Sequence, residues 1–271
     1  MSSRWRRISA IVRKDLDDVG RQPGLLLPAV AMVLGLTLPA FLVLVITPRL
    51  TGESLADSEF AEAAAAAITV IPGLAPLAAA GQAQALVLQH FLMFSLIVPV
   101  LGSLSLAAQA VIGEKQSRAL EPLLATPLTT TELLVAKVAT PFGLSMLLTL
   151  ASFCLYLAGM GVWGEPGVWR TMFWPRTVLL YGLLGPLVSW TALMLAAIVS
   201  SRVNDARTAQ QLGAFIILPI TALFVGQLAG QFLLGVPALL LTALALVLAN
   251  LALTWVGVRV FQRETILIRW K

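Results

Sequence analysis

Few residues of this sequence have the types and spacing that catalysis requires. His90 is the only histidine and Cys154 the only cysteine, so the sequence cannot supply the paired histidines or the cysteine cluster of a zinc site. It also lacks the G-x-S-x-G turn of serine hydrolases. Gly113 precedes Glu114 and Lys115, but a phosphate-binding loop needs two glycines at a different spacing. We therefore expect no catalytic, cofactor or metal site in this chain.

The charged residues with the most informative spacing lie in residues 113–131. Pro127 disfavours helical geometry at Thr126, and Thr129 with Glu132 forms a capping box that starts a second helix. Leucines beside charged side chains suit an interface with an apolar centre and a polar rim; the alternative is a solvated loop on the lipid head groups. The residues of this predicted docking surface are Glu114, Lys115, Arg118, Leu120, Glu121, Leu123, Leu124, Thr126 and Pro127.

Apolar segments that could span a membrane flank this loop. Hydrophobic residues make up 59% of the 271 residues and charged residues only 11%, whereas a soluble domain has about 25% charged residues. A helix needs about 20 apolar residues to cross the hydrocarbon core. Six runs without Asp, Glu, Lys or Arg are long enough, and they are Gly24–Ile46, Phe91–Ile112, Val138–Gly161, Thr177–Ser200, Ala209–Leu234 and Pro237–Val258.

Basic residues predict the orientation, because they are retained on the cytoplasmic side of a membrane. With both termini in the cytoplasm, 15 of the 18 basic residues lie inside, and only Arg49, Arg170 and Arg176 lie outside. A seventh span through Ala61–Ala80 would leave 8 inside and 10 outside. The net charge of +5 is thus explained by topology and requires no nucleic-acid partner. Residues 47–90 then form an external loop with a helix near the membrane surface, and His90 lies at the outer end of the second span.

The N-terminal segment, residues 1–23, is predicted to be an amphipathic helix in the membrane interface. Its apolar residues fall on one helical stripe and its charged residues elsewhere; the alternative is a simple basic anchor. The stripe contains Trp5, Ile8, Val12, Leu16 and Val19. The sequence therefore predicts an all-α integral membrane protein with one transmembrane domain over residues 1–271. It has six transmembrane helices, cytoplasmic termini, an N-terminal interfacial helix and a cytoplasmic coupling helix between spans 2 and 3.

The sequence of the loop between spans 2 and 3 resembles the corresponding loop of a known protein family. It reads E-K-x-x-x-x-L-E-x-L-L-A-T-P-L-x-x-x-E-L-L-x-x-K from Glu114 to Lys137, and its position after the second of six spans is similar to that in the ABC-2 type permeases. These are the membrane subunits of ATP-binding-cassette exporters. Weaker similarities are the basic N-terminal helix, the start of span 5 and the basic C-terminal tail. The sequence departs from the commonest pattern at Arg118-Ala119, where glycine and threonine are frequent.

The resemblance implies that residues 113–131 contain the helix that docks on a separate ATPase subunit. It implies a homodimer of this chain with two ATPase copies, and ATP with Mg²⁺ bound to those partners alone. Two-fold symmetry is the commonest closed arrangement of identical subunits. The complex would lie in the plasma or inner membrane and export its substrate by alternating access. The runner-up hypothesis is a membrane scaffold or sensor that binds a cytoplasmic partner and transports nothing.

Uncharged polar and small residues within the spans are candidates for helix packing or for a substrate pathway. They are Gln109, Gly226, Gln227, Gly230, Gln231 and Asn250. No predicted span contains Asp, Glu, Lys or Arg, although ion-coupled transporters usually have ionisable residues there. We therefore expect the energy to come from another subunit, and lipid-like, drug-like or other amphipathic cargo is favoured over small ions. Span 5 is longer than the membrane core requires, so we expect a re-entrant turn between spans 5 and 6.

Overall fold

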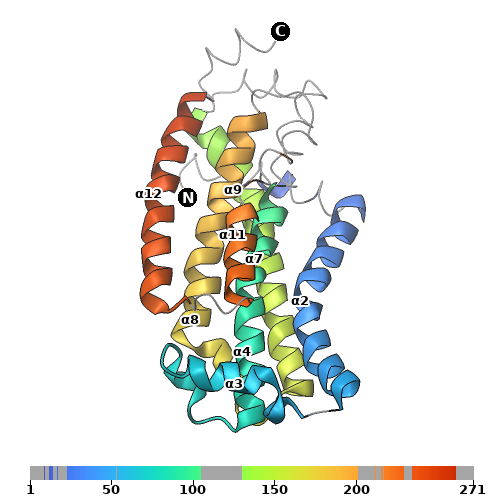
Figure 1. Cartoon of the computed structure of the whole chain (residues 1–271). Helices are drawn as coiled ribbons and strands as arrows, with labels where there is room; N and C mark the ends of the chain where they lie inside the picture. The colour runs from blue at the N-terminus through green and yellow to red at the C-terminus, as the bar shows by residue number, and fades with distance from the viewer. Residues whose placement is uncertain are drawn as a thin grey trace.

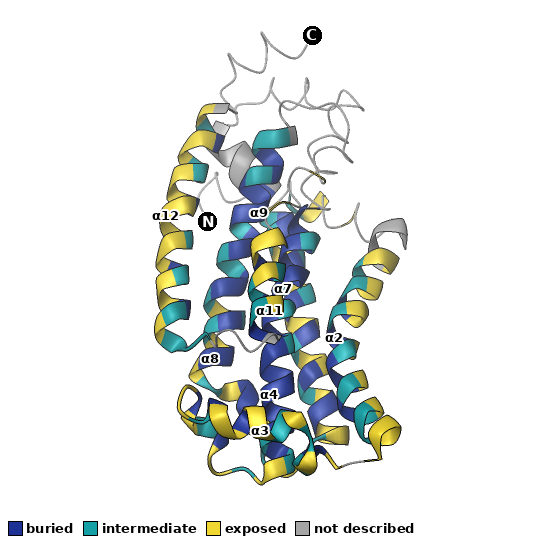
Figure 2. Ribbon diagram, viewed as in Figure 1, coloured by how far each residue is buried: buried dark blue, intermediate teal, exposed yellow. Residues whose placement is uncertain are grey.

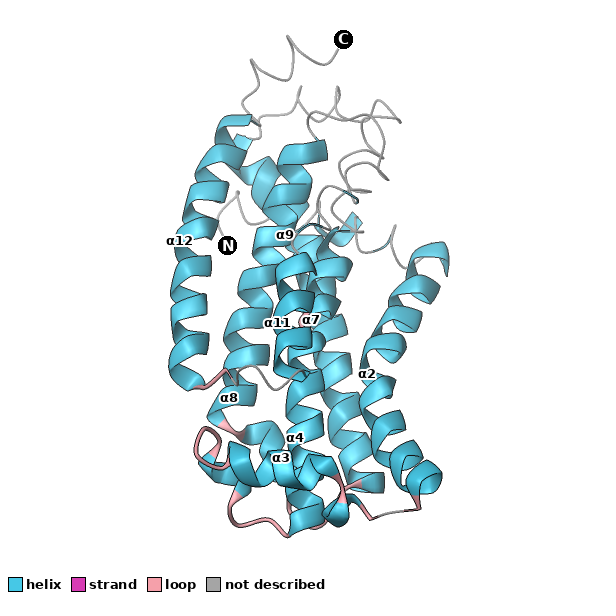
Figure 3. Cartoon of the chain, in the orientation of Figure 1, coloured by secondary structure: helices cyan, strands magenta, loops and turns pink. Residues whose placement is uncertain are grey.

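The chain is helical throughout the part that the structure describes (Figure 3). This computed structural model describes residues 23–52, 54–104, 130–200, 217–228 and 234–260, together with a few isolated positions before residue 18 and between residues 211 and 215. Every regular element in these ranges is a helix. The predicted all-α class is confirmed for these residues.

Five of the described helical segments are long and apolar enough to cross a membrane. Four of them contain the long helices α2 (Pro23–Thr51), α4 (Ala79–Phe94), α7 (Thr130–Trp163) and α12 (Val236–Val260). The remaining segment combines α8 (Pro175–Val178), a π-helical stretch (Leu179–Leu184) and α9 (Gly185–Ser200). The five candidate spans are Leu27–Thr51, Ala79–Leu104, Val138–Trp163, Pro175–Val199 and Val236–Arg259.

The remaining predicted span, 209–234, contains the shorter helix α11 (Ile217–Leu228). Leu234, the last residue of this predicted span, and Gly235 are not helical. In Figure 1 the facing ends of α11 and α12 lie at a similar level, well short of the end of the bundle that α3 covers. The expected re-entrant turn falls on residues 229–233, which lie outside the described part, so it stays a prediction.

The second span begins much earlier than predicted. Its helix α4 starts at Ala79 rather than Phe91, so the last part of the predicted external loop 47–90 belongs to a membrane-length helix. The predicted run starts after His90, and Gln82, Gln84 and Gln89 precede it. In the fold, Gln84 and Gln89 are buried and hydrogen-bond with neighbouring segments. These hydrogen bonds lower the free-energy cost of burying the two amides inside the bundle.

The helices pack around α4, which is the most buried of the candidate spans. About 83% of its most apolar stretch is buried, compared with 17% for α12, and Figure 2 shows the same contrast between the two helices. α4 contacts α2 and α11, while α9 packs against α7 and α12. The short helix α3 (Glu59–Ala67) lies across one end of the bundle and packs on α4 (Figure 1).

The outer helices expose apolar side chains, as expected when lipid is the solvent. On α2, the buried residues Val33, Thr37, Ala40, Phe41 and Leu44 recur at helical spacing. The exposed side of the same helix is also apolar and contains Leu27, Val30, Leu34, Leu38, Leu42 and Ile46. Water would disfavour such a surface, whereas a lipid environment accommodates it.

A close contact between α2 and α7 gives a stability prediction. A Cβ atom on Gly159 would overlap the ring of Phe41. This ring is confined by Tyr156 and Trp163, whose ring centroids lie 5.6 and 5.7 Å away. We expect Gly159→Ala to displace the ring and to destabilise the protein by about 1–3 kcal/mol. The thermal unfolding temperature of the purified protein in detergent measures this change.

Gly161→Ala is the matched control for this substitution. Gly161 lies on the same helix, and a Cβ atom there would meet nothing within 4 Å. Alanine also favours the helix more than glycine does, so this variant should unfold at the same or a higher temperature. Equal unfolding temperatures for both variants would contradict the packing of Phe41 on Gly159.

Candidate functional site

The predicted docking surface, residues 114–127, lies outside the described residues, as do Gln109, Gly230 and Gln231. The structure does describe the backbone that follows this loop. α7 starts at Thr130 and runs for 34 residues to Trp163, whereas its apolar span starts only at Val138. Residues 130–137, which follow the predicted docking surface, are therefore continuous with span 3 as one helix. The capping box predicted at Thr129 lies outside the described residues and stays a prediction.

Asn250 connects α12 to α9 through two hydrogen bonds. Its Oδ1 accepts from the hydroxyl of Thr191 at 2.8 Å, and its Nδ2 donates to the carbonyl oxygen of Leu187 at 3.0 Å. One turn further along α12, Thr254 accepts a hydrogen bond from the indole of Trp190 at 3.0 Å. These contacts satisfy polar groups inside the bundle, which is how polar side chains hold membrane helices together.

Three buried serines connect α7 and α9 to the second span. The hydroxyl oxygens of Ser103 and Ser145 lie 3.0 Å apart, and those of Ser145 and Ser189 lie 2.9 Å apart. Ser145 also donates to the carbonyl oxygen of Pro99 at 3.1 Å. Each hydroxyl has a partner within the cluster, so this region is accounted for by helix packing.

A buried arginine makes a different kind of site. Arg176 lies in the first turn of α8, after Trp174 and Pro175, and only 4% of its surface is exposed. Its Nη2 donates a hydrogen bond to Oε1 of Gln227 on α11 at 3.2 Å. Its Nε and Nη1 have no hydrogen-bond partner among the described residues. The described residues thus give this guanidinium, which lies between α8 and α11, one hydrogen bond.

Other groups on α4 and α11 surround this contact. Nε2 of Gln227 lies 3.2 Å from the sulfur of Met93, and Nδ1 of His90 donates to the carbonyl oxygen of Leu86 at 2.8 Å. The His90 ring also lies near Arg176 and the backbone of Gln227. We call Arg176, Gln227, His90 and Met93 the Arg176 site. It joins the second span, the start of the fourth and α11.

A second polar contact lies beside this site. The neighbours of His90 and Arg176 in sequence, Gln89 and Thr177, hydrogen-bond to each other at 2.8 Å, and both donate to the carbonyl oxygen of Thr171. The buried Oε1 of Gln89 and Oγ1 of Thr171 have no partner in the described part of the chain. Polar groups are therefore concentrated where spans 2 and 4 meet the 3-10 helix Val168–Phe173.

Sequence reasoning identified Gln227 but missed its partner. Apolar runs were ended at the nearest charged residue, so span 4 was predicted to start at Thr177 and Arg176 was assigned to an external loop. The predicted runs start after His90 and Arg176, whereas the candidate spans Ala79–Leu104 and Pro175–Val199 include both residues. His90 is also not at a helix end, since it is the twelfth residue of α4. The positions of His90 and Arg176 within the bundle become clear only from their contacts with other helices.

The comparison with protein families decides the identity of this bundle. The model of a family described as ABC-2 family transporter protein matches residues 50–256. The chain belongs to the ABC-2 transporter family. No curated protein matched the sequence significantly. The match covers all the described helices from α3 to α11 and most of α12.

Membership of the ABC-2 family makes this chain a multi-pass membrane protein and a permease subunit of an ATP-binding-cassette transporter. Such a permease is the transmembrane subunit and not itself the catalytic one, and the family implies pairing with an ABC ATPase subunit. The resemblance found in residues 114–137 is therefore confirmed at the level of the family. In this permease, the Arg176 site lies between the described spans.

Proposed function

We propose that this permease exports a substrate from the cytoplasm as one half of a homodimer driven by two ATPase subunits. The family match over residues 50–256 carries this proposal. ATP and Mg²⁺ bind to the partner subunits, and the permease converts their closure into alternating access. The complex lies in the plasma or inner membrane with both termini of the permease in the cytoplasm.

The course of α7 supports a mechanical role for the cytoplasmic loop. Residues 113–131 dock on the ATPase in this proposal, and α7 continues from Thr130 through the membrane to Trp163. Movement of the loop would therefore be transmitted to the outer end of span 3. There α7 packs on α2, where Gly159 contacts Phe41. The buried contacts of Ser145 connect the middle of α7 to α9 and the second span.

Transport by the reconstituted complex tests this function. The permease and the ATPase that co-purifies with it are placed in proteoliposomes with candidate amphipathic substrates, and substrate movement is followed after addition of ATP and Mg²⁺. Movement should depend on ATP hydrolysis and on the permease. A complex that hydrolyses ATP yet moves none of a broad panel of substrates would favour the scaffold or sensor hypothesis instead.

The proposed orientation gives a labelling prediction. Asp57 is exposed in the 3-10 helix Leu55–Asp57 beside α3, and we place it on the non-cytoplasmic side with the rest of residues 47–78. In a Cys154→Ser background, a cysteine at residue 57 should react with a membrane-impermeant maleimide in intact cells. A cysteine at residue 118 should react only after the membrane is opened. The reverse pattern would contradict the 15-to-3 distribution of basic residues.

A further inference from the structure

We propose that Arg176 binds the anionic head group of an amphipathic substrate. The guanidinium remains charged at any physiological pH and has five N–H donors. Among the described residues, the only hydrogen bond of the guanidinium is the one from Nη2 to Gln227. The neutral amide of Gln227 supplies a dipole rather than a counter-charge. Nε and Nη1 together carry three further donors without a partner there. This inference rests on the proposed function, because it takes the anion to be part of the cargo.

Burial makes the missing counter-charge significant. Transferring a charge out of water is costly unless it is paired and hydrogen-bonded, and Arg176 is only 4% exposed. No carboxylate of the described residues hydrogen-bonds to it. A phosphate or carboxylate would supply several strong acceptors, and the planar guanidinium binds these groups particularly well. An anionic ligand therefore fits the unsatisfied part of this site.

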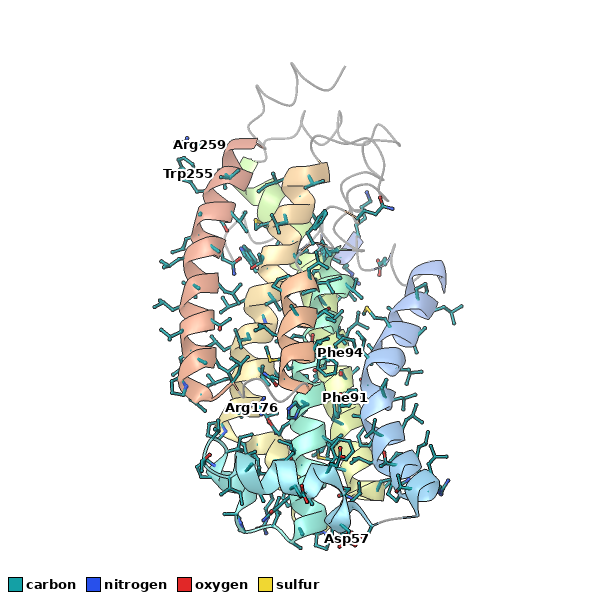
Figure 4. All side chains as sticks on the ribbon, in the orientation of Figure 1. Asp57, Phe91, Phe94, Arg176, Trp255 and Arg259 are labelled. Carbon is teal, nitrogen blue, oxygen red and sulfur yellow. The ribbon has the colours of Figure 1, made fainter. Side chains whose placement is uncertain are left out.

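An apolar surface next to the Arg176 site indicates an amphipathic ligand rather than a free anion. Phe224 lies one turn before Gln227 on α11, and its ring is 5.5 Å from that of Phe91 and 4.6 Å from that of Phe94, measured between centroids. Phe91 and Phe94 are only half-buried. In Figure 4, Phe91 lies at about the level of Arg176, and Phe94 lies further from the end that contains Asp57. A ligand with its head group at Arg176 could place its apolar part along these rings.

The bond between Arg176 and Gln227 gives this site a way to open. It joins the start of span 4 to α11 through one neutral hydrogen bond of 3.2 Å, and such a bond contributes little net stability. An anion forms stronger, charge-assisted bonds with the same guanidinium. Ligand binding would therefore replace the contact with Gln227 and loosen α11 from α8. In this proposal the Arg176 site binds the substrate, and that binding also releases α11 from α8.

Direct binding of an anionic amphiphile to the full-length chain tests this inference. The purified permease in dodecyl maltoside is titrated with dodecyl phosphate, and bound molecules are counted by native mass spectrometry. Wild type should bind dodecyl phosphate, whereas Arg176→Gln should bind it at least about tenfold more weakly, because hydrogen bonds to a charged group are lost. Arg170→Gln is the matched control, since Arg170 is exposed in the same external segment and stacks on Trp169. This control should bind as wild type does.

A second variant keeps the test decisive if Arg176→Gln does not fold. Gln227→Glu has nearly the same shape and places a carboxylate at the existing 3.2 Å contact. This internal anion should neutralise Arg176 and weaken dodecyl phosphate binding by at least about tenfold. Wild-type affinity in either folded variant would overturn the proposal.

Inorganic phosphate distinguishes the two sources of an anion. At the same concentration it should not displace dodecyl phosphate if the apolar chain contributes to binding. Full displacement would overturn the assignment of an amphipathic ligand and leave a site for free phosphate. The assay needs neither the ATPase nor transport, so its failure is distinguishable from failure of the proposed function. A permease that exports but binds dodecyl phosphate equally well without Arg176 contradicts this inference alone.

Discussion

A permease carrying both Leu123→Asp and Leu124→Asp is expected to lose its ATPase while its spans stay in the membrane. If residues 113–131 dock on the ATPase, these leucines lie in the apolar centre of the interface. Truncating a central apolar contact commonly costs more than about 1 kcal/mol of binding, and two carboxylates would also have to be desolvated. Co-purification of the ATPase should fall to background, and ATP-driven transport should stop.

Glu121→Ala is the control for the double substitution. Glu121 belongs to the polar rim of the predicted docking surface, where an exposed ion pair contributes about 0–1 kcal/mol. This variant should keep most of its ATPase and its transport. Membrane insertion of all variants is checked with the cysteine at residue 57, which should remain reactive from outside. A double-Asp permease that still binds its ATPase and still exports would place the coupling surface elsewhere, such as on the N-terminal segment.

The membrane class could be predicted because the bilayer imposes a simple requirement on composition. A span must be apolar over about 20 residues, and the candidate spans Leu27–Thr51, Val138–Trp163 and Val236–Arg259 start close to where the predicted runs start. Their outward faces are apolar as well, so the runs are continuous in the sequence. Neither packing partners nor side-chain contacts are needed to recognise such helices.

The second span was mislocated because its polar residues are satisfied by tertiary contacts. α4 is the most buried candidate span, so it is surrounded mainly by protein and can accommodate Gln84, Gln89 and His90. The amide of Gln84 accepts a hydrogen bond from the backbone of Glu165 at 2.7 Å, across 81 residues of sequence. A local reading of hydrophobicity cannot anticipate such a partner. The same limitation placed Arg176 in a loop.

The candidate site could therefore be predicted only in part. Gln227 stood out as a polar residue within an apolar run, but the sequence left packing and pathway roles open. The structure adds that its Oε1 faces Arg176, a residue whose charge had been counted only for orientation. The contact joins residues 51 positions apart, and it depends on α11 lying against α4. The contact between Arg176 and Gln227 can therefore be identified only in the folded structure.

A proline at residue 135 is expected to uncouple ATP hydrolysis from transport. Val135 lies in the helical part of α7 that precedes the apolar span at Val138. Proline inside a helix removes a backbone hydrogen bond and costs about 3 kcal/mol, and it disfavours helical geometry at Leu134 as well. α7 would then no longer join the cytoplasmic loop to span 3 as one rigid helix.

The expected result differs from that of the double-Asp variant. The docking surface itself is unchanged, so Val135→Pro should retain the ATPase and hydrolyse ATP, while substrate transport falls at least about tenfold because the break of about 3 kcal/mol interrupts the helix. Val135→Ala is the control, since alanine favours the helix and should keep transport near the wild-type rate. Transport and hydrolysis are measured on the same proteoliposomes. Wild-type transport by the proline variant would mean that α7 is not the element that carries the motion, and the contact between α11 and α8 would become the next candidate.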